Sequence, residues 1–150
     1  MSLTLATPVG SIRITASQTE LTAIDWGSGA SEPTALLVEA AAQITAYFEG
    51  TRHGFDLPLA MPAQGSFQQR FLQALIDIPF GHTVTYGDLA ATLGAPAQAI
   101  GQACGGNPLP IVIPCHRVLG ASGLGGYSGA GGIETKVALL RHEGAAGLLI

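Results

Sequence analysis

The apolar residues of this chain change their periodicity along the sequence. Over the first 26 residues they alternate with polar ones in the short runs "LTLATPVG", "SIRITAS" and "LTAIDW". Alternation puts every second side chain on one face of a strand, so these runs predict an antiparallel meander. Later segments, above all those after Ser66, show helical spacing instead. The chain is therefore predicted to be α/β in content and α+β in order, with a small sheet first and most helices after it.

One helix and a linker join the two parts. The segment "PTALLVEAAAQITAYFEG" has helical spacing and ends at Gly50, a residue suited to a left-handed C-cap. Residues 51–65 contain Pro58 and Pro62, lack a helical pattern and include one short predicted strand, "FDLPL". We therefore expect two domains, residues 1–62 and 63–150.

Three short helices are predicted between residues 66 and 106. "SFQQRFLQALIDIP" opens with a Ser66–Gln69 capping box, and "TYGDLAATLG" opens with a Thr85–Asp88 capping box and stops at Gly94. "APAQAIGQACGG" places a proline in its first turn and ends at a glycine pair. The last two helices, joined by a tight glycine turn, favour a helix-turn-helix whose second member is the candidate recognition helix.

The remaining segments are a strand, a loop and a helix. The apolar run from Pro108 to Pro114 predicts a strand that ends at Cys115, "ASGLGGYSGAGG" predicts a glycine-rich loop, and "IETKVALLRHEG" predicts a helix that ends at Gly144. Neighbouring residues of a strand point to opposite faces, so His116 is expected to reach the Cys115 thiol through a bridging water.

Composition narrows the class of protein. Hydrophobic residues make up 47% of the 150 residues, no uncharged apolar run is long enough to span a membrane, and no basic flank precedes an apolar run at the N-terminus. Two cysteines indicate free thiols rather than a disulfide scaffold. These features favour a soluble, cytoplasmic protein.

Charge is low and unevenly distributed. The formal net charge is −4, and only 11% of the residues are charged. Residues 1–65 carry two basic and six acidic residues, whereas residues 66–150 carry four of each. The bulk charge gives no sign of a polyanionic partner.

Cys115 is the strongest candidate for chemistry. Most free cysteines are buried packing residues, and a thiol becomes a useful nucleophile only with a base that a third group orients. His116 can supply the base and Glu143 the orienting carboxylate. Glu143 lies at the end of a helix, where the macrodipole disfavours a negative charge, so a specific partner is expected for it. This triad logic fits several reaction classes.

The sequence around Cys115 resembles a known family. "IPCHRV", with "GNP" upstream, "GYSG" downstream and "KVALLRHEG" at the end, is similar to the O6-alkylguanine-DNA alkyltransferases, or methylated-DNA-protein-cysteine methyltransferases. The resemblance runs from about Ser66 to Gly144. It implies a winged-helix-like helix-turn-helix domain there, and in outline a ribonuclease-H-like sheet-plus-helix domain before it.

The resemblance also implies a reaction and a set of site residues. Cys115 would take the alkyl group irreversibly from guanine O6, with O4-alkylthymine as a further possible substrate. His116 would be the water-mediated base, Glu143 would orient it, Asn107 would brace the active-site turn, and Tyr86 would donate to the departing guanine. The residues implied in substrate binding are Tyr127, Ser128, Val118, Gln98, Lys136 and Arg117.

The implied substrate is a nucleotide flipped out of alkylated DNA, with the glycine-rich loop as a lid over it. No cofactor, no metal and no membrane is implied, and the protein is expected to act as a monomer. Some family members hold a structural zinc in the N-terminal domain, but no cysteine precedes Cys104 here, so no zinc is expected. Cys104 itself is expected to be a packing residue, with a second alkyl acceptor as the alternative.

Two further departures concern the substrate. Gln98 stands where family members usually carry an arginine, and the candidate recognition helix has no basic residue, which predicts weaker duplex binding. The segment between Tyr127 and Lys136 holds two residues more than the family spacing, which leaves the alkyl-group preference open.

Two other functions compete with repair by transfer. The alkyltransferase-like lesion sensors share this fold but lack the reactive cysteine, so the intact "PCHRV" argues against that reading. The acidic balance and Gln98 would instead fit a thiol that accepts alkyl groups from single-stranded DNA, a free base or a small alkylating metabolite. A self-labelling tag engineered from the family would look similar.

Overall fold

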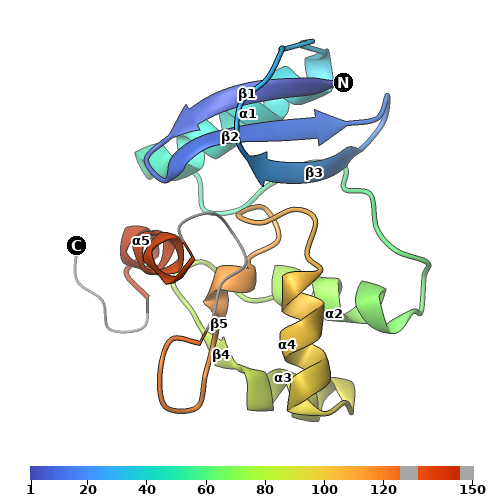
Figure 1. Cartoon of the computed structure of the whole chain (residues 1–150), viewed down its shortest axis with the longest axis vertical. Helices are drawn as coiled ribbons and strands as arrows, with labels where there is room; N and C mark the ends of the chain where they lie inside the picture. Colours follow the sequence, from blue (N-terminus) through green and yellow to red (C-terminus); the bar gives the residue numbers. More distant parts are fainter. Residues whose placement is uncertain (126–131, 146–150) are drawn as a thin grey trace. The chain divides into compact units, whose positions relative to one another are not determined.

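The computed structural model divides the chain into two units, Met1–Ala60 and Met61–Ile150, and describes residues 1–125 and 132–145 (Figure 1). Buried apolar side chains occur in both units. Each unit is considered by itself below.

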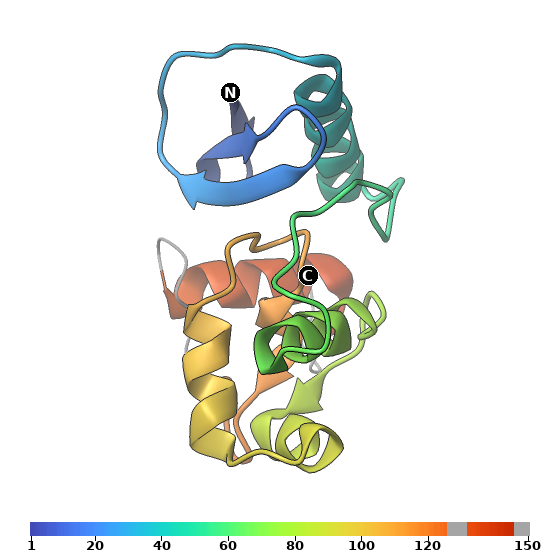
Figure 2. The same ribbon diagram turned by 90° about the vertical axis from the view of Figure 1, so that its right-hand side faces the viewer.

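The N-terminal unit is a three-stranded sheet covered by one helix. Strands β1 (Ser2–Thr7), β2 (Gly10–Ala16) and β3 (Leu21–Trp26) form an antiparallel meander in the order β1-β2-β3, as the alternating runs predict. Helix α1 (Ala35–Glu49) packs against β1 and β2 (Figures 1 and 2). The strand expected over residues 55–59 is reduced to a single bridge between Leu59 and Leu21.

Helix α1 has the ends that its sequence predicts. The Thr34 side chain accepts a hydrogen bond from the Leu37 amide, and Gly50 closes the helix in the left-handed region at φ 83°. The face of α1 toward the sheet and the inner face of the sheet form one apolar core. Its fully buried members include Ile12, Ile14, Leu21, Leu37, Ala40, Ile44 and Tyr47.

The C-terminal unit is mainly helical. It contains helices α2 (Phe67–Ile76), α3 (Tyr86–Leu93), α4 (Ala97–Gly105) and α5 (Ile133–Glu143). Strands β4 (Val84–Thr85) and β5 (Val118–Leu119) form a short parallel pair. A 3₁₀ turn, η1 (Cys115–Arg117), precedes β5 and contacts α5.

Helices α3 and α4 form the predicted helix-turn-helix. They pack on each other, and Gly94 closes α3 in the left-handed region at φ 65°. The capping box is complete at Thr85 and Asp88. At α2 only half of the expected box forms, since Ser66 accepts from the Gln69 amide while the Gln69 side chain accepts from Gly65 rather than from Ser66. The mixed α/β architecture, with the small sheet first, is confirmed.

The strand predicted from Pro108 to Pro114 is wrong. The segment forms consecutive turns, and Ile111 adopts a positive φ of 74°. Its three prolines lack the N–H groups that a strand would need, and hydrogen bonds within the segment replace the ladder. Leu109, Ile111 and Ile113 are nonetheless buried, so the apolar pattern marked burial correctly and secondary structure incorrectly. Within the described residues, no helix has the length and apolar character needed to cross a membrane.

Candidate active site

Cys115 opens the 3₁₀ turn η1 at the end of the buried turn segment. Its side chain is almost enclosed, with the residue 6% exposed, and its amide donates to the Ile113 carbonyl at 2.8 Å. Because Cys115 and His116 lie in a 3₁₀ turn, the opposite-face argument for neighbouring strand residues does not apply to them.

Asn107 fixes the segment that carries Cys115. Its Nδ2 donates to the Ile113 carbonyl at 2.9 Å, and its Oδ1 accepts from the Leu109 amide at 3.0 Å. Its own amide donates to the carbonyl of Cys104, near the end of α4, at 3.3 Å. One amide side chain therefore links both ends of the turn segment and joins it to the candidate recognition helix.

His116 and Glu143 form a buried pair. His116 Nε2 lies 2.7 Å from Glu143 Oε2, and both side chains are fully buried. This bond gives Glu143 the specific partner that its position predicts. A carboxylate only accepts, so Nε2 carries the proton and Nδ1 presents a lone pair when the ring is neutral. Among the described residues, none forms a hydrogen bond with Nδ1.

Arg117 completes this cluster from the inside. Its Nε donates to Glu143 Oε1 and its Nη2 to Oε2, both at 2.9 Å, while Nη1 donates to the Ile78 carbonyl at 2.6 Å. The Gly81 amide approaches Glu143 Oε1 at 3.4 Å. The sequence grouped Arg117 with substrate binding, whereas the structure leaves it 5% exposed with its guanidinium directed at these interior acceptors. No sequence signal pointed to Ile78 or Gly81, which act through backbone atoms.

Lys136 is a second buried cation. The residue is fully buried, and its Nζ donates to the Val118 carbonyl at 2.6 Å. The same Nζ lies 5.9 Å from the centre of the Tyr86 ring. Burial lowers the pKa of Lys136, and the nearby thiols of Cys104 and Cys115 oppose that effect. Lys136, Val118 and Tyr86 are thus brought together.

Tyr86, the first residue of α3, lies against the loop that follows β5. Gly125 has φ 72°, and a Cβ added there would lie 2.9 Å from Tyr86 Cε2 and 3.1 Å from its hydroxyl oxygen. Only glycine combines that backbone conformation with so close an approach. Tyr127 and Ser128 follow in the same loop and lie outside the described residues.

The environment keeps both thiols protonated at rest. Burial raises the pKa of Cys115, and the Asn107 side chain and the positive charge of Lys136 counteract it in part. Burial and the neighbouring Cys115 raise the pKa of Cys104 to about 12. Burial also lowers the pKa of His116, against the opposing pull of Glu143. The arrangement therefore pairs a neutral thiol with a neutral imidazole, so a thiolate must be generated by a base during attack.

The remaining candidates lie elsewhere. Gln98 is exposed on α4, a helix without a basic residue, so it is not part of the buried cluster around Cys115. No group of three or more His, Cys, Asp or Glu residues in the described part of the chain is arranged to hold a metal ion.

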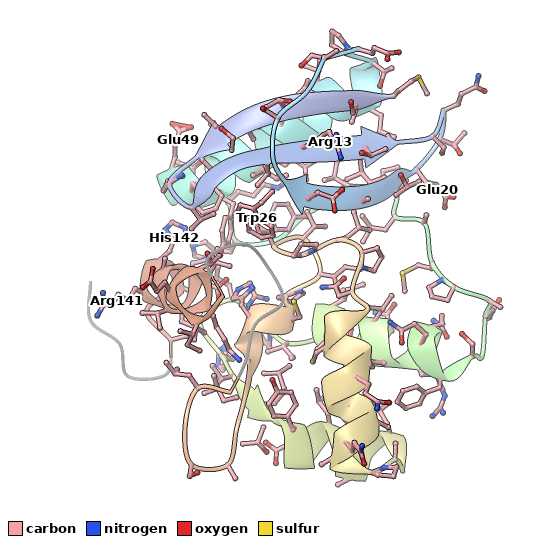
Figure 3. All side chains as sticks on the ribbon, viewed as in Figure 1. Arg13, Glu20, Trp26, Glu49, Arg141 and His142 are labelled. Atoms are coloured by element: carbon pink, nitrogen blue, oxygen red, sulfur yellow. The ribbon has the colours of Figure 1, made fainter. Side chains whose placement is uncertain are left out.

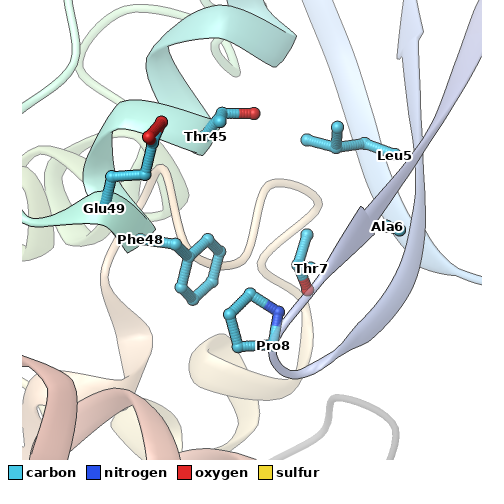
Figure 4. A pocket seen from close by; sticks show the side chains of 7 residues that line it. All are labelled: Leu5, Ala6, Thr7, Pro8, Thr45, Phe48 and Glu49. Atoms are coloured by element: carbon cyan, nitrogen blue, oxygen red, sulfur yellow. The ribbon is translucent and has the colours of Figure 1, made fainter.

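Two surface pockets do not involve the cluster. One of about 190 Å³ lies within the N-terminal unit between the β1–β2 turn and α1, as Figure 4 shows. The other, of about 390 Å³, lies between α2 and α3. Neither is lined by Cys115, His116 or Glu143.

Comparison with known proteins assigns a family to both units. The model of the 6-O-methylguanine DNA methyltransferase DNA binding domain matches residues 66–145, and that of the ribonuclease-like domain matches residues 3–61. A methylated-DNA--protein-cysteine methyltransferase of Mycobacterium bovis is 50% identical over 104 residues, which cover 67% of this chain and 61% of that protein. The constitutive methyltransferase of that name from Bacillus subtilis is 39% identical over 155 residues, which cover 93% of each.

A solved structure agrees with these matches. Mycobacterium tuberculosis OGT in complex with DNA superposes with a TM-score of 0.82 at 38% identity, over 95% of this chain and 92% of that one. The family models together cover nearly the whole sequence, including the segment that carries Cys115, His116 and Glu143. The chain therefore belongs to the O6-methylguanine DNA methyltransferase family.

Proposed function

We propose that this protein repairs DNA by direct reversal, transferring the alkyl group of O6-alkylguanine irreversibly to Cys115. O4-alkylthymine is included as a further substrate. The observation that carries the proposal is the buried Cys115–His116–Glu143 cluster, in which one imidazole nitrogen is fixed by a carboxylate and the other is left as a base. The relatives' names and the DNA complex of a similar protein support it.

The proposed reaction is a single displacement. A bond forms between Cys115 Sγ and the alkyl carbon while the bond from that carbon to guanine O6 breaks. The thiol proton passes through a water molecule to His116 Nδ1, and the departing guanine gains one proton, so the equation balances. Tyr86 is the proposed donor toward the guanine, and Asn107 holds the turn that carries the thiol.

Each unit has a proposed part in this function. Residues 63–150 would form the alkyltransferase domain, with α4 as recognition helix, and residues 1–62 the accompanying ribonuclease-like domain. The flipped nucleotide would contact Tyr127, Ser128, Val118 and Lys136, and Gln98 would lie at the duplex. We place the reaction in the cytoplasm and assign it to a monomer without cofactor or metal.

The test is intact-protein mass spectrometry after incubation with a duplex that carries one O6-methylguanine. Transfer adds one methylene, about 14 Da, to the wild type and nothing to Cys115→Ala, because only a thiolate at this position can act as nucleophile. Cys104→Ala is the matched control and should still gain the mass, since the pKa of Cys104 is raised to about 12. A mass gain that survives in Cys115→Ala would refute the assignment.

A second candidate substrate has one observation in its favour. Helix α4 carries no basic residue and Gln98 is exposed on it, so the phosphate contacts that dominate duplex affinity are reduced. Transfer from single-stranded DNA or free O6-benzylguanine, with none from duplex, would keep the nucleophile and discard duplex repair. Binding of the lesion without transfer to any substrate would leave a lesion-sensing protein.

A further inference from the structure

The charge balance around Glu143 carries an inference about Arg117. Both carboxylate oxygens are engaged: Oε2 faces His116 Nε2 and Arg117 Nη2, and Oε1 faces Arg117 Nε and the Gly81 amide. Nη1 is anchored separately on the Ile78 carbonyl. The guanidinium is thus held at three points, and a bidentate geometry of this kind is available to arginine but not to lysine.

We propose that Arg117 is a positioning residue that neutralises Glu143 and so keeps His116 uncharged, with its proton on Nε2 and Nδ1 able to accept the proton of Cys115. The inference rests on the proposed function for its kinetic readout. Its second readout, the protonation of His116, does not depend on any substrate.

The electrostatic reason is the sign of the charge that His116 faces. A buried carboxylate alone beside an imidazole favours the imidazolium, which holds protons on both nitrogens and cannot act as a base. With Arg117 bonded to both oxygens, His116 faces a neutral pair. Burial then lowers the pKa of His116, and the positive charges of Arg117 and Lys136 act in the same direction.

The surroundings of the cluster contain few other charges. Helix α5 contributes Glu143 and Lys136, η1 contributes Cys115 and Arg117, and the segment before β4 contributes backbone atoms and the Phe80 ring, 6.0 Å from the guanidinium. The His142 ring meets Phe80 edge to face at 6.2 Å, and Cys104 lies on α4 with its pKa raised to about 12. Arg117 is therefore the cation that directly balances Glu143.

The test compares the pH dependence of alkyl transfer in single turnovers with a nuclear magnetic resonance titration of the His116 ring nitrogens. In Arg117→Met the acid limb of the transfer rate should move upward by about one pH unit or more, because a nearby unbalanced charge shifts a pKa by about 1 to 3 units. The rate should therefore fall about tenfold more at pH 6 than at pH 8. His116 should titrate as a cation in the same range.

Two further variants separate charge from shape. The double variant Arg117→Met/Glu143→Gln removes both charges, so its acid limb should return toward that of the wild type. Arg117→Lys keeps the charge and loses the fork, so its rate should fall while its acid limb stays in place. Arg141→Met makes the same chemical change at an exposed arginine of α5, which projects outward in Figure 3, and should leave both readouts unchanged.

The outcomes are distinct from those of the proposed function. A wild type that transfers nothing to any substrate would refute the function, while the His116 titration would still decide the role of Arg117. If Arg117→Met slows transfer equally at every pH and His116 stays neutral, Arg117 is only a structural anchor and the inference fails. If Arg117→Met does not fold, a raised His116 pKa in the double variant or in Arg117→Lys would overturn it equally.

Discussion

The two units of the chain treat polar groups in opposite ways. In the N-terminal unit, Gln43 is the one buried polar side chain among the described residues, and it is paired with the backbone of Asp56 through both ends of its amide. The C-terminal unit buries His116, Arg117, Lys136 and Glu143. The unit with the larger net charge thus keeps its charges at the surface, and the electrically balanced unit buries them.

This difference teaches where the chain spends stability on chemistry. Removing two charges from water costs several kcal/mol per ion, and the attraction between them repays it only in part. A hydrophobic replacement would often be as stable, so the cluster is better explained by what it does to the thiol than by its contribution to folding. Four tests can break or sharpen the contrast between the units.

The largest effect on stability is expected from Glu143→Ala. It leaves Arg117 and His116 buried without their carboxylate, which should cost about 3 to 5 kcal/mol of the free energy of unfolding. Urea unfolding followed by circular dichroism measures it. Glu49→Ala, at the exposed end of α1, should stay within about 0.5 kcal/mol, and an equal loss in both variants would abolish the contrast.

A core deletion should act differently in the N-terminal unit. Ile44 is fully buried in α1, so Ile44→Ala should cost about 2 to 5 kcal/mol through lost packing and a cavity. The fluorescence of Trp26, the one tryptophan of the chain, reports unfolding of this unit. Transfer per folded molecule should be unchanged. Val38→Ala, at a residue 54% exposed, is the control and should be nearly neutral.

Acid should destabilise the C-terminal unit through His116. Burial lowers the pKa of His116 in the folded state, so below the unfolded value of 6.5 the unfolded chain binds a proton that the folded chain does not. Stability from this residue is complete above pH 6.5 and is lost as the pH falls, by about 2 kcal/mol at pH 5 if the ring stays neutral. The comparison of wild type with His116→Gln, by thermal unfolding at both pH values, isolates it. Identical slopes in the two proteins would contradict a neutral His116.

The smallest effect is expected to be the same in both units. Thr34 caps α1 and Thr85 caps α3, each accepting from an amide three residues on. Thr34→Ala and Thr85→Ala should each cost about 1 kcal/mol, since a lost N-cap acts locally. Similar losses would show that the units differ in their buried charges and not in their helices. A much larger loss for Thr85→Ala would point to strain passed on to the neighbouring Tyr86.

Local signals predicted most elements of the fold. Alternation gave the meander, and helical spacing with glycine stops gave the ends of α1, α3 and α5. The failure at residues 108–114 has a local cause as well. An apolar run indicates burial in a strand or in a turn alike, and three prolines together with the Asn107 side chain favoured turns here.

The sequence by itself determined the residue types of the site: a cysteine followed by a histidine and an arginine, a capped helix ending in a glutamate, and a family pattern that joins them. Tertiary structure alone decided how they meet. Glu143 lies 26 and 27 residues from Arg117 and His116, and Ile78 lies 39 residues before Arg117, so no periodicity links them. Packing of α5 against η1 brings them together, because buried charges persist only where every donor meets an acceptor.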